Sequence, residues 1–117
     1  MRHVSIRRID EGPLSEPVLL ILTALADRPR HGYALITEIE TISRGRVRLS
    51  TGTLYGALHR LLNAGWIERF DQQDTSRDKQ AYRLTALGRG HLQTELDRMQ
   101  QLTRTATARL KTAGAEV

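Results

Sequence analysis

Cysteine is absent from the 117-residue chain, which excludes disulfide bonds, thiolate metal sites and a cysteine nucleophile. Aromatic residues are scarce, at 4% of the chain, and no apolar run reaches the roughly 20 residues of a membrane-spanning helix. The first twelve residues lack the apolar segment of a signal peptide. We therefore expect a cytoplasmic protein with no membrane partner, built as one domain with one appended element.

Signs of metal or enzyme chemistry are also missing from the sequence. The four histidines stand far apart and lack the spacing of metal ligands. The chain has no nucleophile-elbow motif and no glycine pattern that cradles phosphates. We therefore predict no metal site, no cofactor and no enzymatic activity.

Positive charge is what the sequence has in excess. Lys and Arg number 18 against 13 Asp and Glu, which gives a net charge of +5, and 16 of the basic residues are arginines. A genomic base composition that favours Arg codons would also raise the Arg content, but it does not explain why residues 28–60 hold six arginines and only two glutamates. Because guanidinium groups bind phosphates and base edges with paired hydrogen bonds, this segment favours a nucleic acid as partner.

Three short helices are predicted in the first half of the chain. The first begins after the capping residue Ser15 and runs to about Asp27, with apolar residues on almost every face, as in a buried helix. A break at residues 28–32 contains Pro and Gly, and the second helix follows from about Tyr33 to Ser43.

The third helix is predicted from Thr51 to about Ala64, with Ser50 as its N-cap and Gly65 as its stop. Its leucines form one apolar stripe. At about 100° per residue, the opposite face carries small and hydrogen-bonding residues, namely Gly52, Gly56, His59, Arg60 and Asn63, flanked by Thr53 and Tyr55.

Two strands, Trp66–Asp71 and Lys79–Thr85, are predicted to form a hairpin around a polar turn. A long last helix begins at Thr85 or Ala86 and runs to about Lys111. Its apolar residues recur at steps of three and four, so we predict a dimerisation stripe of Leu92, Leu96, Met99, Leu102, Ala106 and Leu110.

This order of elements describes a mainly helical fold with a small β-hairpin, a winged helix-turn-helix with a long C-terminal dimerisation helix. We expect a flexible basic arm over residues 1–12, the DNA-binding domain over 13–85, and the dimerisation helix with its tail over 86–117. The third helix would enter the major groove and the hairpin tip would contact the DNA backbone. The candidate DNA-binding residues are Tyr33, Ser50, Thr51, Gly52, Thr53, Tyr55, His59, Arg60, Arg77 and Lys79.

The run from Leu49 to Leu61, LSTGTLYGALHRL, followed by Gly65-Trp66-Ile67, resembles the PadR family of transcriptional regulators. The tripeptide His31-Gly32-Tyr33 and the run YRLT that starts at Tyr82 fit the same family. The resemblance implies a homodimeric repressor of transcription that binds double-stranded DNA and whose final helix supplies the dimer contacts. Some members respond to phenolic acids or to flat, cationic or antibiotic-like drugs, so the resemblance also allows a small aromatic or drug-like effector.

The sequence departs from the family pattern mainly in the wing. Gln80 stands where a basic residue is usual, and Ala81 replaces an aromatic residue. The turn carries Arg77 and Lys79 against three aspartates, so we expect a weak wing contact with phosphate. The acidic turn also favours an alternative function, a winged-helix protein-interaction module without specific DNA binding.

For three aromatic residues the sequence allows either a core position or a role in binding. Trp66 favours a core position over a ligand platform. For Tyr33, packing in the core and contact with phosphate are equally supported, whereas Tyr55 favours phosphate contact because it flanks the polar face of the third helix.

Overall fold

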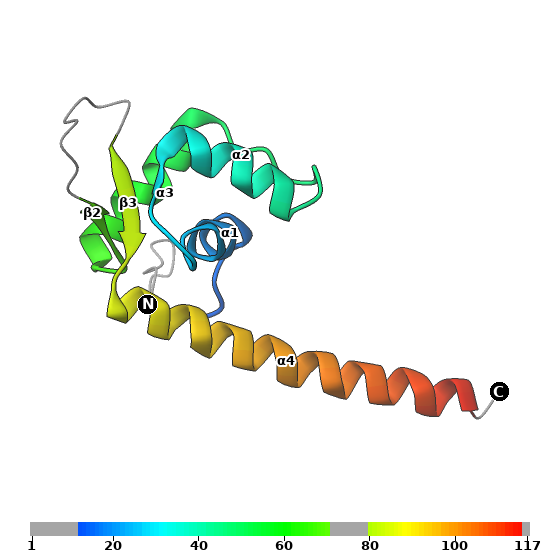
Figure 1. Ribbon diagram of the computed structural model, residues 1–117. Coiled ribbons are helices and arrows are strands. Elements are labelled where there is room, and N and C mark those ends of the chain that lie inside the picture. The colour runs from blue at the N-terminus through cyan, green and yellow to red at the C-terminus, as the bar shows by residue number, and fades with distance from the viewer. Residues whose placement is uncertain (1–11, 71–79, 116–117) are drawn as a thin grey trace, which may run out of the picture.

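The computed structural model in Figure 1 describes residues 12–70 and 80–115. Apart from Gly12, the predicted N-terminal arm lies outside the described residues, and so do the wing residues Arg77 and Lys79. The predicted fold class is confirmed: three short helices and a small antiparallel sheet precede one long C-terminal helix.

Capping residues start the first helices where the sequence predicts them. Helix α1 (Glu16–Ala24) begins after Ser15, whose side-chain oxygen accepts a hydrogen bond from the Val18 backbone N–H at 3.4 Å. The helix ends at Ala24 rather than at the predicted Asp27. The chain must leave the helix before Pro29, because the residue that precedes a proline disfavours helical backbone.

Helices α2 (Gly32–Ile42) and α3 (Thr51–Ala64) also follow their local signals. The Ser50 side chain accepts a hydrogen bond from the Thr53 backbone N–H at 3.1 Å, which satisfies a free donor of the first turn of α3. Gly65 ends α3 with a φ of 80°, a left-handed conformation that glycine adopts without steric cost.

The sheet corrects the predicted two-stranded hairpin. Besides β2 (Ile67–Phe70) and β3 (Ala81–Leu84), it contains β1 (Arg30–His31), which lies within the segment predicted as a break. The strand order is β1-β3-β2, so β3 is the central strand. A two-residue strand has no periodicity of its own, and only its pairing with β3 defines it.

Buried residues occur on both faces of β3. Ala81 and Tyr82 point to opposite faces of the sheet, and both are buried. Only Arg83 of the strand is exposed.

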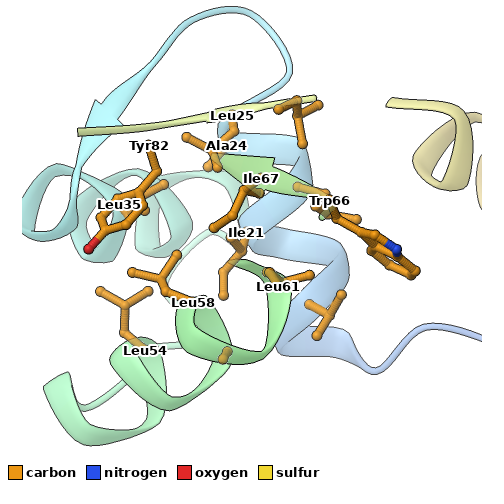
Figure 2. Packing of buried hydrophobic residues seen from close by; sticks show 14 of the residues in the cluster. Ile21, Ala24, Leu25, Leu35, Leu54, Leu58, Leu61, Trp66, Ile67 and Tyr82 are labelled. Atoms are coloured by element: carbon orange, nitrogen blue, oxygen red, sulfur yellow. The ribbon is translucent and has the colours of Figure 1, made fainter. Parts of the chain in front are cut away.

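The core lies between the three short helices and one face of the sheet, as Figure 2 shows. Trp66 is 1% exposed, which confirms the prediction that it is a core residue; it comes just before β2 rather than within it. The other large side chains of this core that are almost completely buried are Ile21, Leu22, Leu25, Leu35, Ile39, Leu54, Leu58, Leu61 and Ile67.

Thr85 joins the start of α4 (Ala86–Ala115) to the end of α3. Its hydroxyl donates a hydrogen bond to the Gly65 carbonyl oxygen at 2.6 Å and accepts one from the Gly88 N–H at 3.1 Å. Its backbone N–H donates to the Trp66 carbonyl oxygen at 3.0 Å. Two of these hydrogen bonds fix Thr85 to the end of α3, and the third caps the first turn of α4.

The first turns of α4 pack closely on Trp66. A Cβ atom at Gly88 would overlap the backbone carbonyl of Trp66, so only glycine allows this approach. His91 stacks on the Trp66 indole, with ring centroids 4.1 Å apart and an angle of 16° between the planes. Arg89 donates a hydrogen bond to the Ala26 carbonyl at 3.1 Å and so holds the chain just beyond α1.

Further along, α4 leaves the rest of the molecule. Its buried residues are Gly88, Leu92 and Glu95, and beyond Glu95 every residue as far as Ala115 is exposed except the half-buried Thr105. Figure 1 shows this part of the helix extending past the other elements toward the C-terminus. The helix is longer than the sequence predicts, since it passes the expected end at Lys111.

Candidate nucleic-acid interface

The outward face of α3 has the composition that the sequence predicts. Leu54, Ala57, Leu58 and Leu61 point into the core. The residues predicted on the opposite face are all exposed: Thr51, Gly52, Thr53, Tyr55, Gly56, His59, Arg60 and Asn63. We call these eight residues the reading face.

The N-terminal end of the reading face is open and held in a defined geometry. Ser50 contacts the Thr53 hydroxyl at 3.0 Å in addition to its backbone N–H. A Cβ atom built at Gly52 meets no heavy atom within 4 Å, so nothing in the described chain covers this turn. A helix N-terminus presents free N–H groups and the positive end of the helix dipole, both of which favour a phosphate.

Arg60 and Gly56 lie together on the reading face. A Cβ atom at Gly56 would lie 3.8 Å from the Arg60 Nη1 atom, so the guanidinium extends back along the helix over the glycine. His59 contacts the Asn63 side chain at 3.3 Å one turn further on. The guanidinium of Arg60 thus lies at the centre of the reading face, in ordinary contact distance of position 56.

The two tyrosines of the predicted interface differ in their surroundings. Tyr33 is 63% exposed at the start of α2, which excludes the core alternative. Tyr55 is 37% exposed, and its hydroxyl lies against Gly32, where a Cβ atom would overlap it. Tyr55 therefore links α3 to the N-terminus of α2, and Gly32 is the residue that permits the contact.

One arginine of the basic segment has an internal role that the sequence did not indicate. Arg30 donates a hydrogen bond from Nε to the Ala24 carbonyl at 2.7 Å and forms ion pairs with Asp27 and Glu38 at 3.4 and 3.7 Å. Its side chain is only 12% exposed. Arg30 therefore caps the end of α1, and its charge is not available to a ligand.

The other arginines of this segment lie at the surface. Arg28, Arg44, Arg46 and Arg60 are exposed, and Arg48 forms an exposed ion pair with Glu40 at 3.8 Å. Ion pairs of this kind contribute about 0–1 kcal/mol, so phosphate can replace the carboxylate at small cost. The connector between α2 and α3 is therefore basic in the structure as well as in the sequence.

The hairpin strands carry two cations that are not among the DNA-binding residues predicted from the sequence. Arg83 pairs with Glu68 at 2.7 Å and lies over the Phe70 ring, 5.0 Å from its centroid. Arg69 is exposed and stands opposite Tyr82 in the register of β2 and β3. The alternation of β2 and β3 could have assigned Arg69 and Arg83 to faces of the sheet, but it could not identify their neighbours on the paired strand.

Comparison with known proteins adds the family. Residues 21–94 match the model of the Transcriptional regulator PadR-like family, which is more than half of the chain. The chain belongs to the PadR family. PadR-family proteins are DNA-binding regulators of transcription and not enzymes.

Two relatives of this PadR-family chain come from bacteria. It is 36% identical over 86 residues to Transcriptional regulator Rv3488 of Mycobacterium tuberculosis, a match that covers 74% of this chain and 78% of that protein. It is 39% identical over 84 residues to an uncharacterised 37.1 kDa protein in transposon TN4556 of Streptomyces fradiae, covering 72% of this chain but only 23% of that protein.

The PadR fold is also evident in solved structures. A PadR family transcription regulator from Clostridium difficile R20291 matches with a TM-score of 0.67 at 21% sequence identity, over 82% of this chain and 99% of that one.

Within the described residues of the present chain, no helix is long and apolar enough to cross a membrane, and no group of three metal-ligating side chains occurs.

The predicted dimerisation residues of this PadR-family chain divide into two groups. Leu92 is 6% exposed and belongs to the core of its own chain, so it is not free to contact a second copy. The other five are exposed along α4. Their exposed fractions are 44% for Leu96, 38% for Met99, 60% for Leu102 and 75% for Leu110, and Ala106 is exposed as well. We call these five residues the α4 stripe.

Proposed function

We propose that this PadR-family regulator is a cytoplasmic homodimeric repressor that binds a palindromic operator in double-stranded DNA. The reading face supports this proposal most strongly. It places hydrogen-bonding side chains and two glycines on the exposed side of a helix whose other side is fixed in the core. A rigid helix with such a face can enter the major groove and contact base edges.

In the proposed complex the reading face and the residues around it contact different parts of the DNA. Thr53, Tyr55, His59 and Arg60 contact base edges or nearby phosphates, with Gly52 allowing close approach. Ser50 and Thr51 position the N-terminus of α3 at a phosphate, and Tyr33 contacts the backbone from α2. The exposed arginines of the connector neutralise further phosphates and release counterions, which makes binding depend on salt.

The proposed dimer forms through the α4 stripe. Four large apolar side chains are exposed on a helix that extends beyond its own domain. A second copy that packs along this stripe would remove it from water and place two reading faces on one duplex. Two identical faces related by a twofold axis require a palindromic operator.

The wing is proposed to contribute less than α3. Its turn has Arg77 and Lys79 beside Asp71, Asp74 and Asp78, so its net charge is unfavourable for phosphate. We expect Arg77→Ala to weaken operator binding by less than Tyr55→Ala in the same titration. A larger loss from Arg77→Ala would show that the wing, and not α3, supplies the main contact.

Release of DNA by a small aromatic or drug-like effector is a further part of the proposal. Such a ligand acts only if it binds the non-reading dimer more tightly than the reading one. A coupling free energy of about 1–3 kcal/mol would change operator affinity about 5- to 150-fold. Because coupling is reciprocal, operator DNA must weaken the binding of phenolic acids or planar cations by the same factor.

A second candidate function is a winged-helix protein-interaction module without specific DNA binding, which the acidic turn favours. A mobility-shift titration with DNA from upstream of the protein's own gene, in excess competitor DNA, separates the two. The repressor proposal predicts a retarded complex that survives the competitor. Equal affinity for both DNAs, or none for either, would contradict it and favour the protein-interaction module.

A further inference from the structure

Arg69 and Arg83, the two cations on the strands of the hairpin, lie on opposite faces of the sheet. In β2, Arg69 shares a face with Ile67, and in β3 the paired residue Tyr82 lies on that same face. Ile67 and Tyr82 pack in the core against the helices, as Figure 2 shows. Arg69 therefore continues the helix-facing side of the sheet outward, beyond the point where the core ends and solvent begins.

The pairing of the strands brings Arg69 and Tyr55 to the same part of β3. Arg69 stands opposite Tyr82 in the sheet. The Tyr55 hydroxyl lies against Gly32, which follows His31, and His31 pairs with Ala81, the residue before Tyr82. Since Tyr55 belongs to the reading face, Arg69 and that face approach the same end of β3, at the base of the wing.

Arg83 provides the contrast on the same hairpin. It points to the other side of the sheet, where Glu68 binds its Nε at 2.7 Å and Phe70 lies beneath its guanidinium. Over residues 12–70 and 80–115, no carboxylate lies within ion-pair distance of Arg69. The two arginines of the hairpin strands thus point to opposite sides of the sheet.

We infer that Arg69 binds a backbone phosphate of the DNA strand that flanks the base pairs contacted by α3. This inference rests on the proposed function, which it deepens by adding a contact at the base of the wing. An exposed guanidinium can bind a phosphate with two hydrogen bonds, and the contact would fix the angle at which α3 enters the groove. It also supplies the positive charge that the acidic turn lacks.

The test compares Arg69→Ala with Arg83→Ala in full-length protein. Operator affinity is measured by fluorescence anisotropy at several KCl concentrations, with a duplex from upstream of the protein's own gene and a random-sequence duplex as probes. Arg69→Ala should lower affinity about tenfold or more for both duplexes and reduce the slope of log K against log salt by about 1. Arg83→Ala should leave both affinity and slope near the wild-type values.

Arg69→Lys separates the charge from the shape of the side chain. It should restore most of the salt slope, because lysine keeps the positive charge, and only part of the affinity, because it lacks the guanidinium fork. Thermal unfolding of each variant shows whether the domain remains folded. A wild-type salt slope in Arg69→Ala, or equal losses in Arg69→Ala and Arg83→Ala, would overturn the inference.

Failure of the inference and failure of the proposed function give different results. If wild-type protein does not prefer its upstream duplex over the random one, the proposed function is wrong. If the wild type shows that preference and Arg69→Ala binds as tightly with the same slope, only the Arg69 contact is wrong.

Discussion

The first ten residues of α4 and the twenty that follow are parts of one helix with opposite surroundings. Residues 86–95 contain the buried Gly88, Leu92 and Glu95 and pack on Trp66 and the chain beyond α1. Residues 96–115 bury almost nothing, although they extend about 30 Å at 1.5 Å per residue. The first part packs on the core of its own chain, and the second part carries the α4 stripe, which no part of the described chain covers.

The difference shows where the stability of each part comes from. The DNA-binding domain has its own apolar core, so its helices are held by tertiary packing. Most helical stability in proteins comes from tertiary packing of an apolar face rather than from helix propensity. The α4 stripe provides such a face without a partner in its own chain, which is why we propose that a second copy covers it.

The largest expected effect is at the joint between the two parts. Gly88→Ala places a Cβ atom on the Trp66 carbonyl, so we expect a loss of about 3 kcal/mol or more in the free energy of unfolding. Urea unfolding followed by Trp66 fluorescence measures it, since Trp66 is the only tryptophan.

Gly90→Ala is the matched control for that experiment. A Cβ atom at Gly90 meets nothing within 4 Å, so alanine should stabilise the helix by about 0.5–1 kcal/mol. If Gly88→Ala unfolds at the wild-type urea concentration, the joint is looser than described and the two parts of α4 are not held differently.

The second prediction concerns the distal part of α4. Leu96→Glu puts a charge at the N-terminal end of the α4 stripe, and we expect it to convert the proposed dimer into a monomer at micromolar concentration. Light scattering gives the mass directly. Leu87→Glu serves as the control, because Leu87 is 53% exposed but lies outside the stripe. A Leu96→Glu protein with the wild-type mass would disprove dimerisation through this stripe.

The third prediction concerns the reading face, which we expect to act without changing the dimer. Arg60→Ala should cost about 1–3 kcal/mol of operator binding and relax specificity at one base pair per half-site if Arg60 reads a guanine. If it binds phosphate instead, affinity should fall evenly on all sequences. Arg104→Ala, on the exposed distal α4, is the matched control. Wild-type affinity in Arg60→Ala would reject both roles.

The smallest expected effect is a pH dependence at the boundary between the two parts. Hydrogen bonds from Arg98 at 2.7 and 3.0 Å hold the pKa of the buried Glu95 below its ordinary value of 4.5. A lowered pKa in the folded state stabilises the protein above pH 4.5 and loses that effect as the pH falls through the folded-state pKa.

Glu95→Gln should therefore unfold more easily than the wild type at neutral pH, and the difference should shrink below pH 4.5. Thermal unfolding at a series of pH values measures both curves. Asp97→Asn, two residues away on the exposed surface, is the control. Parallel curves for wild type and Glu95→Gln would exclude a stabilising role of the carboxylate.

The sequence predicts those features whose signals are local. Ser50 and Gly65 mark the ends of α3, and the spacing of its leucines assigns the reading face, so helix and face agree with the structure. The order of the predicted elements indicates the winged helix-turn-helix, and the family motif agrees with it. Tyr33 shows the limit of this reasoning, because its exposure depends on how α2 packs and not on its neighbours in sequence.

The features that the sequence does not predict depend on contacts between distant segments. Strand β1 exists only because Arg30 and His31 pair with β3. The internal role of Arg30 depends on the backbone carbonyl of Ala24, which no residue pattern identifies. Leu92 continues the spacing of the α4 stripe, and only the position of the domain core distinguishes it from Leu96.

The most direct test of the two-part account is the mass of the wild-type protein bound to its upstream duplex, measured by multi-angle light scattering after size-exclusion chromatography. The account predicts two chains per duplex, and free protein at twice the 13.2 kDa chain mass. Free protein at 13.2 kDa with one chain per duplex would contradict it, because the α4 stripe would then have no partner and the reading faces would act singly.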